Sequence, residues 1–451
     1  MVVRADGKPL GHWIGIRKGW QEMGLPLGEV LVPLPISLMR THSLLIGATG
    51  SGKSTAIHHL IAQDVLTGHP FIVLDMRGDL VNAALEICAG YVPPSSIALF
   101  DLREKERPLG FNPLFGSGEP HFRALGVLDV VASESDSWGV QLAESLRMAV
   151  MLLAETVCSL TDIEKLFFNA GFRELLISKC QNEQVVGFWN RYGALNTDRQ
   201  LAMATPVLNK VSILFASESL RRTLGNPKPL DLGRHLNQPG SVTLISLAAD
   251  ELHSAGRMFG SMMLSSITRE VFSRVNIPEG KRNPVHLYVD EFEHFGTKEF
   301  ENILAEGRRF GLSLILAHQT LSQLNPKIRS MILNNVGVKL VFRTGREDAQ
   351  VLSKDLCGDP KALDLTQLAT GEAILSTRHE GPTVIEINAP LFKDVGRRSY
   401  EAEEFSRTIK ARNPDWTTHA PIIVPQPKSE SAPVVQPAPD AGHKADLGDW
   451  L

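Results

Sequence analysis

The chain has 451 residues, of which 46 are lysine or arginine and 50 are aspartate or glutamate, so its formal net charge is −4. This length predicts about two or three domains. The near balance of charges excludes a uniformly basic protein, so any contact with DNA must come from local loops or from assembly around a channel.

The four cysteines are scattered with no C-x-x-C spacing, which argues against a structural zinc site or a disulfide framework. No run approaches the ~20 apolar residues of a membrane span, and no apolar signal-peptide core follows the N-terminus. These features predict a protein of the reducing cytoplasm that has no transmembrane segment.

A glycine-rich loop near the N-terminus organises the rest of the sequence. Residues 1–40 contain two short extended stretches, 14–16 and 29–32, which predict a small β segment. The apolar run 43–46 predicts a buried strand, and a helical pattern begins at Thr55. Between them, residues 47–54 read GATGSGKS and fit the pattern G-x-x-x-x-G-K-[ST].

A strand, this loop and a helix in sequence predict a phosphate-binding loop. The glycines let the backbone approach a triphosphate, and the N–H groups and the helix N-terminus supply partial positive charge. Lys53 adds a full charge near the β and γ phosphates of ATP, and Ser54 ligates Mg²⁺. The residues predicted to bind the nucleotide are Gly47, Ala48, Thr49, Gly50, Ser51, Gly52, Lys53, Ser54 and Thr55. The alternative, a glycine-rich surface turn, does not account for the flanking strand and helix.

The remaining pattern predicts an α/β protein with a helical insertion. Apolar runs at 71–75 and 97–101 enclose a helical stretch at 80–88, which is typical of a parallel sheet. Alanine, leucine, glutamate and arginine at helical spacing, with one such helix over 161–176, then predict an all-α insertion of about five to seven helices. The predicted parts are the β segment 1–40, a nucleotide-binding domain in two pieces at 41–116 and 236–415, the insertion 117–235 and a disordered Pro-rich acidic tail 416–451.

Two adjacent acids end the clearest later strand, at 285–289. Asp290 and Glu291 at this position form a Walker B arrangement, in which Asp290 holds Mg²⁺ through water and Glu291 polarises the attacking water. The alternative is an acidic pair that faces solvent at the end of a strand. The presence of Lys53 in the phosphate-binding loop favours the functional interpretation of the acidic pair.

Three further residues follow on the next helix and strand. The strand 312–317 is tipped by Gln319, which is placed to sense the γ-phosphate or is an ordinary polar residue at a strand end. Arg308 and Arg309 precede this strand. One of them enters a neighbouring subunit's ATP site as an arginine finger, or both are solvated loop charges.

The motifs resemble those of the HerA/FtsK superfamily of hexameric DNA-pumping ATPases, and within it the soluble part of type IV secretion coupling proteins of the TraG/TraD kind. The resemblance covers about residues 11–390. It rests on Thr41-His42, on residues 47–54, and on 75–79 (DMRGD), 111–114 (FNPL), 290–292 (DEF), 305–313 (AEGRRFGLS), 317–319 (AHQ), 334–337 (NNVG) and 342–343 (FR).

This resemblance implies a RecA-like P-loop NTPase fold and ATP hydrolysis at the subunit interfaces of a homo-hexamer. Lys53, Asp290 and Glu291 take the roles given above, Arg308 resembles the family's trans-acting arginine with Arg309 as the alternative, and Gln319 resembles the γ-phosphate sensor. It also implies DNA as cargo, and a relaxase or secretion-machinery protein as a partner of the insertion or the tail. Membrane-bound coupling proteins begin with transmembrane helices, and none is predicted in this chain.

The sequence therefore predicts an ATP-driven ring motor that moves or delivers DNA. A ring of six would concentrate the basic loops of each subunit on one channel, for which Arg221, Arg222, Arg346 and Lys354 are candidates. Three alternatives remain open: a motor of the same fold that drives protein export or assembly, a nucleotide-controlled assembly switch, and a small-molecule kinase. A carboxylate placed for water activation argues against the kinase.

Overall fold

The structure is a computed structural model that describes residues 11–17, 30–35, 40–135, 138–292, 295, 297–378, 381–387 and 399–413. The tail predicted at 416–451 lies outside the described residues, as does most of the N-terminal segment. None of the described helices is both long enough and apolar enough to cross a membrane.

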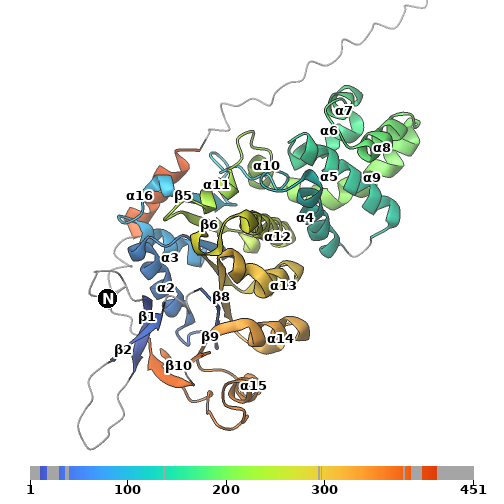
Figure 1. Ribbon diagram of the computed structural model, residues 1–451. Coiled ribbons are helices and arrows are strands. Elements are labelled where there is room, and N and C mark those ends of the chain that lie inside the picture. The colour runs from blue at the N-terminus through green and yellow to red at the C-terminus, as the bar shows by residue number, and fades with distance from the viewer. Residues whose placement is uncertain are drawn as a thin grey trace, which may run out of the picture.

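One sheet of eleven strands runs through the described part of the chain, in the order β2-β1-β11-β10-β9-β3-β8-β7-β4-β6-β5 (Figure 1). The seven strands from β9 to β5 are parallel, and the other four are antiparallel additions at one edge. The strands are β1 (Gly11–Arg17), β2 (Val30–Pro35), β3 (His42–Ile46), β4 (Phe71–Asp75), β5 (Ile97–Asp101), β6 (Val242–Ser246), β7 (Val285–Asp290), β8 (Leu312–His318), β9 (Val336–Val341), β10 (Glu372–Thr377) and β11 (Thr383–Glu386). The predicted α/β class with a mostly parallel sheet is confirmed.

The parallel strands are buried on both faces, which explains why they read as continuous apolar runs. Alternate residues of one strand enter two different cores: Leu45 packs with Ile57 and Leu60 of α2, whereas Leu44 packs in the core that contains Phe259 of α12. The helices are α2 (Lys53–Thr67), α3 (Asp79–Cys88), α11 (Leu232–Leu236), α12 (Ala249–Phe272), α13 (Thr297–Glu306), α14 (Pro326–Asn335), α15 (Arg346–Cys357) and α16 (Ser399–Lys410). Figure 1 shows α2, α3 and α16 on one side of the sheet and α12 on the other.

The segment between β5 and β6 forms a helical lobe beside the sheet (Figure 1). Its helices are α4 (Pro120–Ser133), α5 (Val140–Glu155), α6 (Ile163–Phe168), α7 (Ala170–Ile177), α8 (Glu183–Gly193), α9 (Thr197–Ala216) and α10 (Glu218–Leu224). Phe167, Trp189 and Tyr192 pack edge to face in its core. The sequence pattern predicts one helix over 161–176, but the structure divides it because Asn169 caps α7, its side chain accepting from the Phe172 N–H at 2.9 Å.

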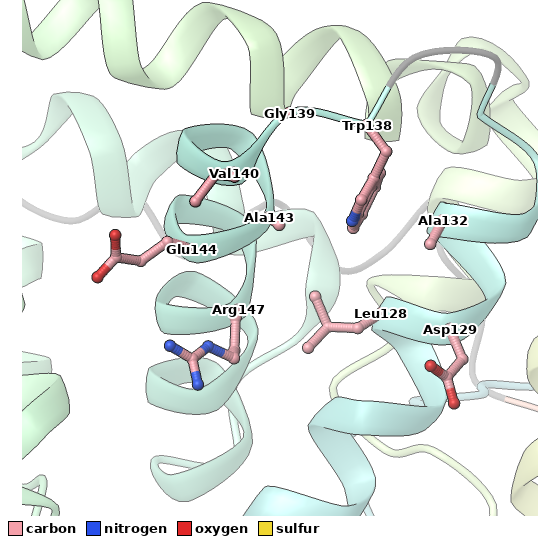
Figure 2. A pocket seen from close by; sticks show the side chains of 9 residues that line it. All are labelled: Leu128, Asp129, Ala132, Trp138, Gly139, Val140, Ala143, Glu144 and Arg147. Atoms are coloured by element: carbon pink, nitrogen blue, oxygen red, sulfur yellow. The ribbon is translucent and has the colours of Figure 1, made fainter.

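An apolar pocket of 640 Å³ opens between α4 and α5 of this lobe. Figure 2 shows Trp138 and Leu128 pointing into the space between the two helices and Glu144 pointing away from it. Asp129, which also lines the pocket, forms an ion pair at 2.5 Å with Lys298 in the first turn of α13. This pair connects the lobe to the helix that follows the Asp290-Glu291 motif.

A buried polar cluster joins the end of α2 to β7. The Asp64 carboxylate is fully buried, lies 2.9 Å from His286 Nδ1 and accepts a 2.5 Å hydrogen bond from the Tyr288 hydroxyl. Burial and the Asp64 charge raise the pKa of Tyr288 well above its usual value, so the hydroxyl remains a donor. His69, Asp64 and His286 place potential metal ligands within 4.8 Å of one another. Because hydrogen bonds already engage the carboxylate, we interpret the cluster as a structural link between α2 and β7.

Tyr288→Phe should lower the free energy of unfolding by about 1.5–3 kcal/mol, because it removes a buried hydrogen bond to a charged carboxylate. Urea unfolding followed by circular dichroism measures the loss. Tyr91→Phe, at a tyrosine that is 57% exposed, is the matched control and should change stability by less than about 0.5 kcal/mol. Equal losses in the two variants would contradict the role of the cluster.

Candidate nucleotide-binding site

Parallel strands bring four of the predicted motifs to one edge of the sheet. The glycine-rich loop follows β3, Asp290 ends β7, Gln319 follows β8 and Asp75 ends β4. Since β4, β7, β8 and β3 are neighbours in the sheet and all are parallel, their carboxyl ends meet at this edge. In open α/β sheets this is the edge at which ligands bind.

The backbone of residues 47–54 has the conformation that a phosphate-binding loop requires. Gly50 and Gly52 have φ values of 73° and 116°, which side-chain-bearing residues rarely adopt. Gly52 is the N-cap of α2, so the N-terminus of this helix opens onto the loop. A Cβ added to Gly47 would lie 2.6 Å from the Phe342 Cβ, so this position requires glycine for close packing.

Three residues outside the loop, of which only Gly371 lies in no recognised motif, hold it in place. The Ala48 N–H donates to the Arg343 carbonyl at 2.8 Å, and the Gly371 N–H donates to the Ser51 carbonyl at 2.9 Å. Phe342 packs against Gly47 and Gly52. No local sequence pattern marks Gly371, which follows β9 by thirty residues; only the pairing of β10 with β9 brings it to the loop.

Lys53 is buried at the centre of the site. Its ammonium group donates to the carbonyls of Gly47 and, at 3.1 Å, of Ala48. Burial lowers the pKa of Lys53, and the nearby charge of Asp290 opposes that shift. The lysine thus places a cation inside the curve of the loop, where the phosphates of a nucleotide would lie.

Asp290 lies in an acidic environment that suits a divalent cation. Burial, and then the charges of Glu291 and Asp75, raise its pKa from 3.8 to about 6, while Lys53 acts in the opposite direction. A bound cation would relieve this repulsion, and Mg²⁺ takes oxygen ligands such as the Asp290 carboxylate and the Ser54 hydroxyl at the start of α2. The residues present therefore fit the predicted magnesium site.

Glu291 is linked to the loop through Gln319. The Gln319 side chain accepts from the Thr49 hydroxyl at 3.2 Å and donates to Glu291 Oε1 at 3.5 Å, the long limit of a hydrogen bond. Arg77 approaches the same Glu291 oxygen at 3.9 Å. Glu291 also has a φ of 52°, a strained value for a residue other than glycine, which is common at functional sites. The structure thus brings Thr49, Gln319 and Glu291 together beside Lys53 and Asp290.

Arg308 and Arg309 lie at the opposite end of the parallel strands, where the strands begin. They belong to the 3-10 turn Gly307–Phe310, which precedes β8, whereas Gln319 follows β8. A seven-residue strand spans about 23 Å, so neither arginine contacts the phosphate loop of its own chain. Arg308 lies instead near His42, at the start of β3. Burial and the charge of Arg308 lower the pKa of His42 to about 4.

The four basic residues considered for a DNA channel do not form one patch within the chain. Arg221 and Arg222 lie on α10 of the helical lobe, and Arg222 is paired with Glu218 at 2.6 Å. Arg346 and Lys354 lie on α15, at the other end of the molecule in Figure 1.

A glycine-rich loop around a buried lysine, with an acidic pair at the end of a neighbouring parallel strand, defines a P-loop nucleotide-binding protein. Two families match the sequence. Residues 27–86 match the type IV secretion-system coupling protein DNA-binding domain, and residues 284–373 match the TraM recognition site of TraD and TraG.

Curated relatives and solved structures agree with these matches. The chain is 23% identical over 400 residues to the DNA double-strand break repair helicase HerA of Sulfolobus acidocaldarius, across 84% of this chain and 71% of HerA. It is 22% identical over 346 residues to the type 4 coupling protein DotL of Legionella pneumophila, across 63% of this chain and less than half of DotL, 44%.

Among solved structures, the plasmid coupling protein TrwB in complex with a non-hydrolysable ATP analogue aligns with a TM-score of 0.58 at 16% identity, over 85% of this chain and 96% of that one. VirB4 of Thermoanaerobacter pseudethanolicus aligns with a TM-score of 0.55 at 14% identity, over 85% and 98%. The predicted resemblance is confirmed: the chain is similar to coupling-protein-like P-loop ATPases of the HerA/FtsK type, and it has a RecA-like α/β fold.

Asp290→Asn should stabilise the folded chain in a pH-dependent way. The carboxyl ionises near pH 3.8 in the unfolded chain and near pH 6 in the folded chain. The loss of folding stability that its negative charge causes is therefore absent below about pH 4 and complete above about pH 6. Without Mg²⁺ or nucleotide, the substitution should raise the free energy of unfolding by about 1–3 kcal/mol at pH 7.5 and by almost nothing at pH 4. Urea titrations in EDTA at the two pH values measure this, and a gain independent of pH would contradict it.

Proposed function

We propose that this protein hydrolyses ATP as a homo-hexameric ring motor that binds and translocates or delivers DNA. The observation that carries the proposal is the division of the catalytic residues between two edges of the sheet. Lys53, Asp290, Glu291 and Gln319 lie at one edge and Arg308 at the opposite edge. Such a site is complete only if a neighbouring copy supplies the arginine, which heterologous contacts around a closed ring would achieve.

In this proposal each residue acts on the terminal phosphate of ATP or on the attacking water. Lys53 and the loop N–H groups bind the β and γ phosphates. Ser54 and Asp290 would hold Mg²⁺, which neutralises phosphate charge when bound. Glu291 polarises the water, Gln319 contacts the γ-phosphate and reports its loss, and Arg308 of the neighbouring subunit stabilises the charge of the transition state.

DNA as the cargo is supported by the relatives rather than by the charge of this chain. HerA is a helicase for DNA double-strand break repair, and residues 27–86 match a family described as a coupling protein DNA-binding domain. A protein partner, such as a relaxase or a component of a secretion machine, is supported by the match of residues 284–373 to a TraM recognition site. A motor that moves protein is the second candidate, because the chain carries a net charge of −4.

The purified protein should hydrolyse ATP, and Lys53→Ala and Glu291→Gln should each reduce turnover by at least about a hundredfold. Double- or single-stranded DNA should stimulate turnover, and the stimulation should fall steeply between 50 and 200 mM salt because phosphate contacts release counterions. A phosphate-release assay measures both effects. Absence of hydrolysis in the intact protein would contradict the proposed motor. Hydrolysis that DNA does not stimulate would favour protein over DNA as the cargo.

Arg308→Ala should lower turnover by about 10³ or more, and mixing should reveal that it acts in a neighbouring site. In an equimolar mixture of Lys53→Ala and Arg308→Ala subunits, about a quarter of the sites combine an intact lysine with an intact arginine, so activity should return to about that fraction. Arg309→Ala is the matched control and should remain active alone. No recovery in the mixture would contradict a trans-acting Arg308, and the reverse pattern would assign the role to Arg309.

A further inference from the structure

Two arginines outside the hydrolysis scheme connect Glu291 to helix α12. Arg77 follows β4, and its guanidinium lies 3.9 Å from Glu291 Oε1. The backbone carbonyl of the same residue accepts a 2.9 Å hydrogen bond from Arg103 Nη1. Arg103 follows β5 and binds two consecutive acids with its other nitrogens, Glu251 at 2.6 Å and Asp250 at 2.5 Å. Both acids belong to the first turn of α12.

The backbone of the loop that carries Arg77 is held in one conformation by its neighbours. Gly78 has a φ of 108°, and a Cβ there would lie 2.8 Å from Ser246 Oγ and 3.5 Å from Arg103 Nη1. Asp75 fixes the other side of the loop, because its carboxylate accepts from the Arg77 N–H at 3.0 Å and from the Leu80 N–H at 2.7 Å. The side chain of Arg77 is 66% exposed, so a fixed backbone carries a side chain that is free to change partners.

Helix α12 has a separate first turn. His253 has non-helical angles, φ 48° and ψ −120°, which kink the helix, and Ala248 before it has a φ of 47°. The first turn is also tied to the β4 loop, because the Ala249 N–H donates to the Met76 carbonyl at 2.8 Å. Beyond the kink, α12 packs against α4 and α9 of the helical lobe. The strained angles lie where a small turn joins a long packed helix, a position suited to a hinge.

We propose that Arg77 is a positioning residue that restrains Glu291, and that Arg103 makes this restraint depend on the first turn of α12, so that the helical lobe and ATP hydrolysis are coupled through these two arginines. The proposal deepens the proposed function and rests on it. An ion pair as exposed as that of Arg77 and Glu291 is weak, which suits a contact that must break in each catalytic cycle. While it is formed, the carboxylate is less available to polarise water.

Arg77→Ala should raise the basal kcat for ATP hydrolysis about two- to fivefold and leave KM unchanged, because it frees Glu291 without touching the phosphate loop. Arg77→Lys should keep kcat near the value of the intact protein, since it retains the charge. Arg199→Ala, at an exposed arginine of α9, is the control for removal of a surface charge. An unchanged or lower kcat in Arg77→Ala would overturn the restraint and make Arg77 a residue that assists the reaction.

Hydrogen exchange tests the connection to α12 without requiring hydrolysis. Addition of ATPγS and Mg²⁺ to the intact protein should change the exchange rate of residues 249–257 about threefold or more, and Arg103→Ala should abolish this change while ATPγS still binds. An equal change in the intact protein and in Arg103→Ala would overturn the proposed connection through Arg103. If ATPγS binds but residues 249–257 do not respond in the intact protein, only the connection between the nucleotide site and α12 is contradicted. If ATPγS does not bind at all, the proposed function fails.

Discussion

The parallel register of β3, β8 and β7 is the constraint on which the site depends. Ile46, the last residue of β3, lies beside His318, the last residue of β8, and Asp290 of β7 lies beside Ala317. This register brings the start of the phosphate loop, the acidic pair and Gln319 to one level of the sheet. A shift of one strand by a single residue would turn its buried side chains to the opposite face, so the two apolar cores that cover the sheet also fix the geometry of the site.

The same sheet separates the arginines from the site that they are proposed to serve. Residues that follow parallel strands gather at one edge, and residues that precede them gather at the other. Arg308 precedes β8, so the fold itself directs it away from its own phosphate loop. The proposed site shared between copies would therefore be a consequence of strand direction, and it would couple ATP turnover to assembly without any additional domain.

The helical lobe is tied to the nucleotide-binding core at more than one place. Helix α12, whose first turn Arg103 joins to the loop that carries Arg77, packs against α4 and α9 of the lobe, and Lys298 of α13 pairs with Asp129 of α4. Buried Glu270 of α12 also accepts from the Ser117 N–H at 2.8 Å, at the entrance to the lobe. The elements that follow β6 and β7 thus connect the candidate nucleotide-binding site with the lobe, which gives a physical route for the proposed coupling between ATP hydrolysis and cargo.

Local patterns were sufficient to predict the parts of the site that lie within single segments. Lys53, Asp290 and Glu291 were predictable because each belongs to a motif attached to a buried strand, and the strands themselves read as apolar runs. Arg343 stood in a recognised motif and Gly371 in none, but the contacts of both with the loop were not predictable, because they reach it only through strand pairing. Arg77 stood in a recognised motif, yet its contact with Glu291 depends on the packing of β4 beside β7. The division of one predicted helix at Asn169 shows that a capping side chain can override helical periodicity.

The most direct test of the central claim is a structure of the assembled protein with Mg²⁺ and ATPγS. We expect the phosphates to lie in the loop of residues 47–54, Lys53 to leave the Gly47 and Ala48 carbonyls to bind them, and Arg308 to reach them from a neighbouring copy. Nucleotide bound elsewhere, or a site completed entirely by residues of one chain, would contradict that claim.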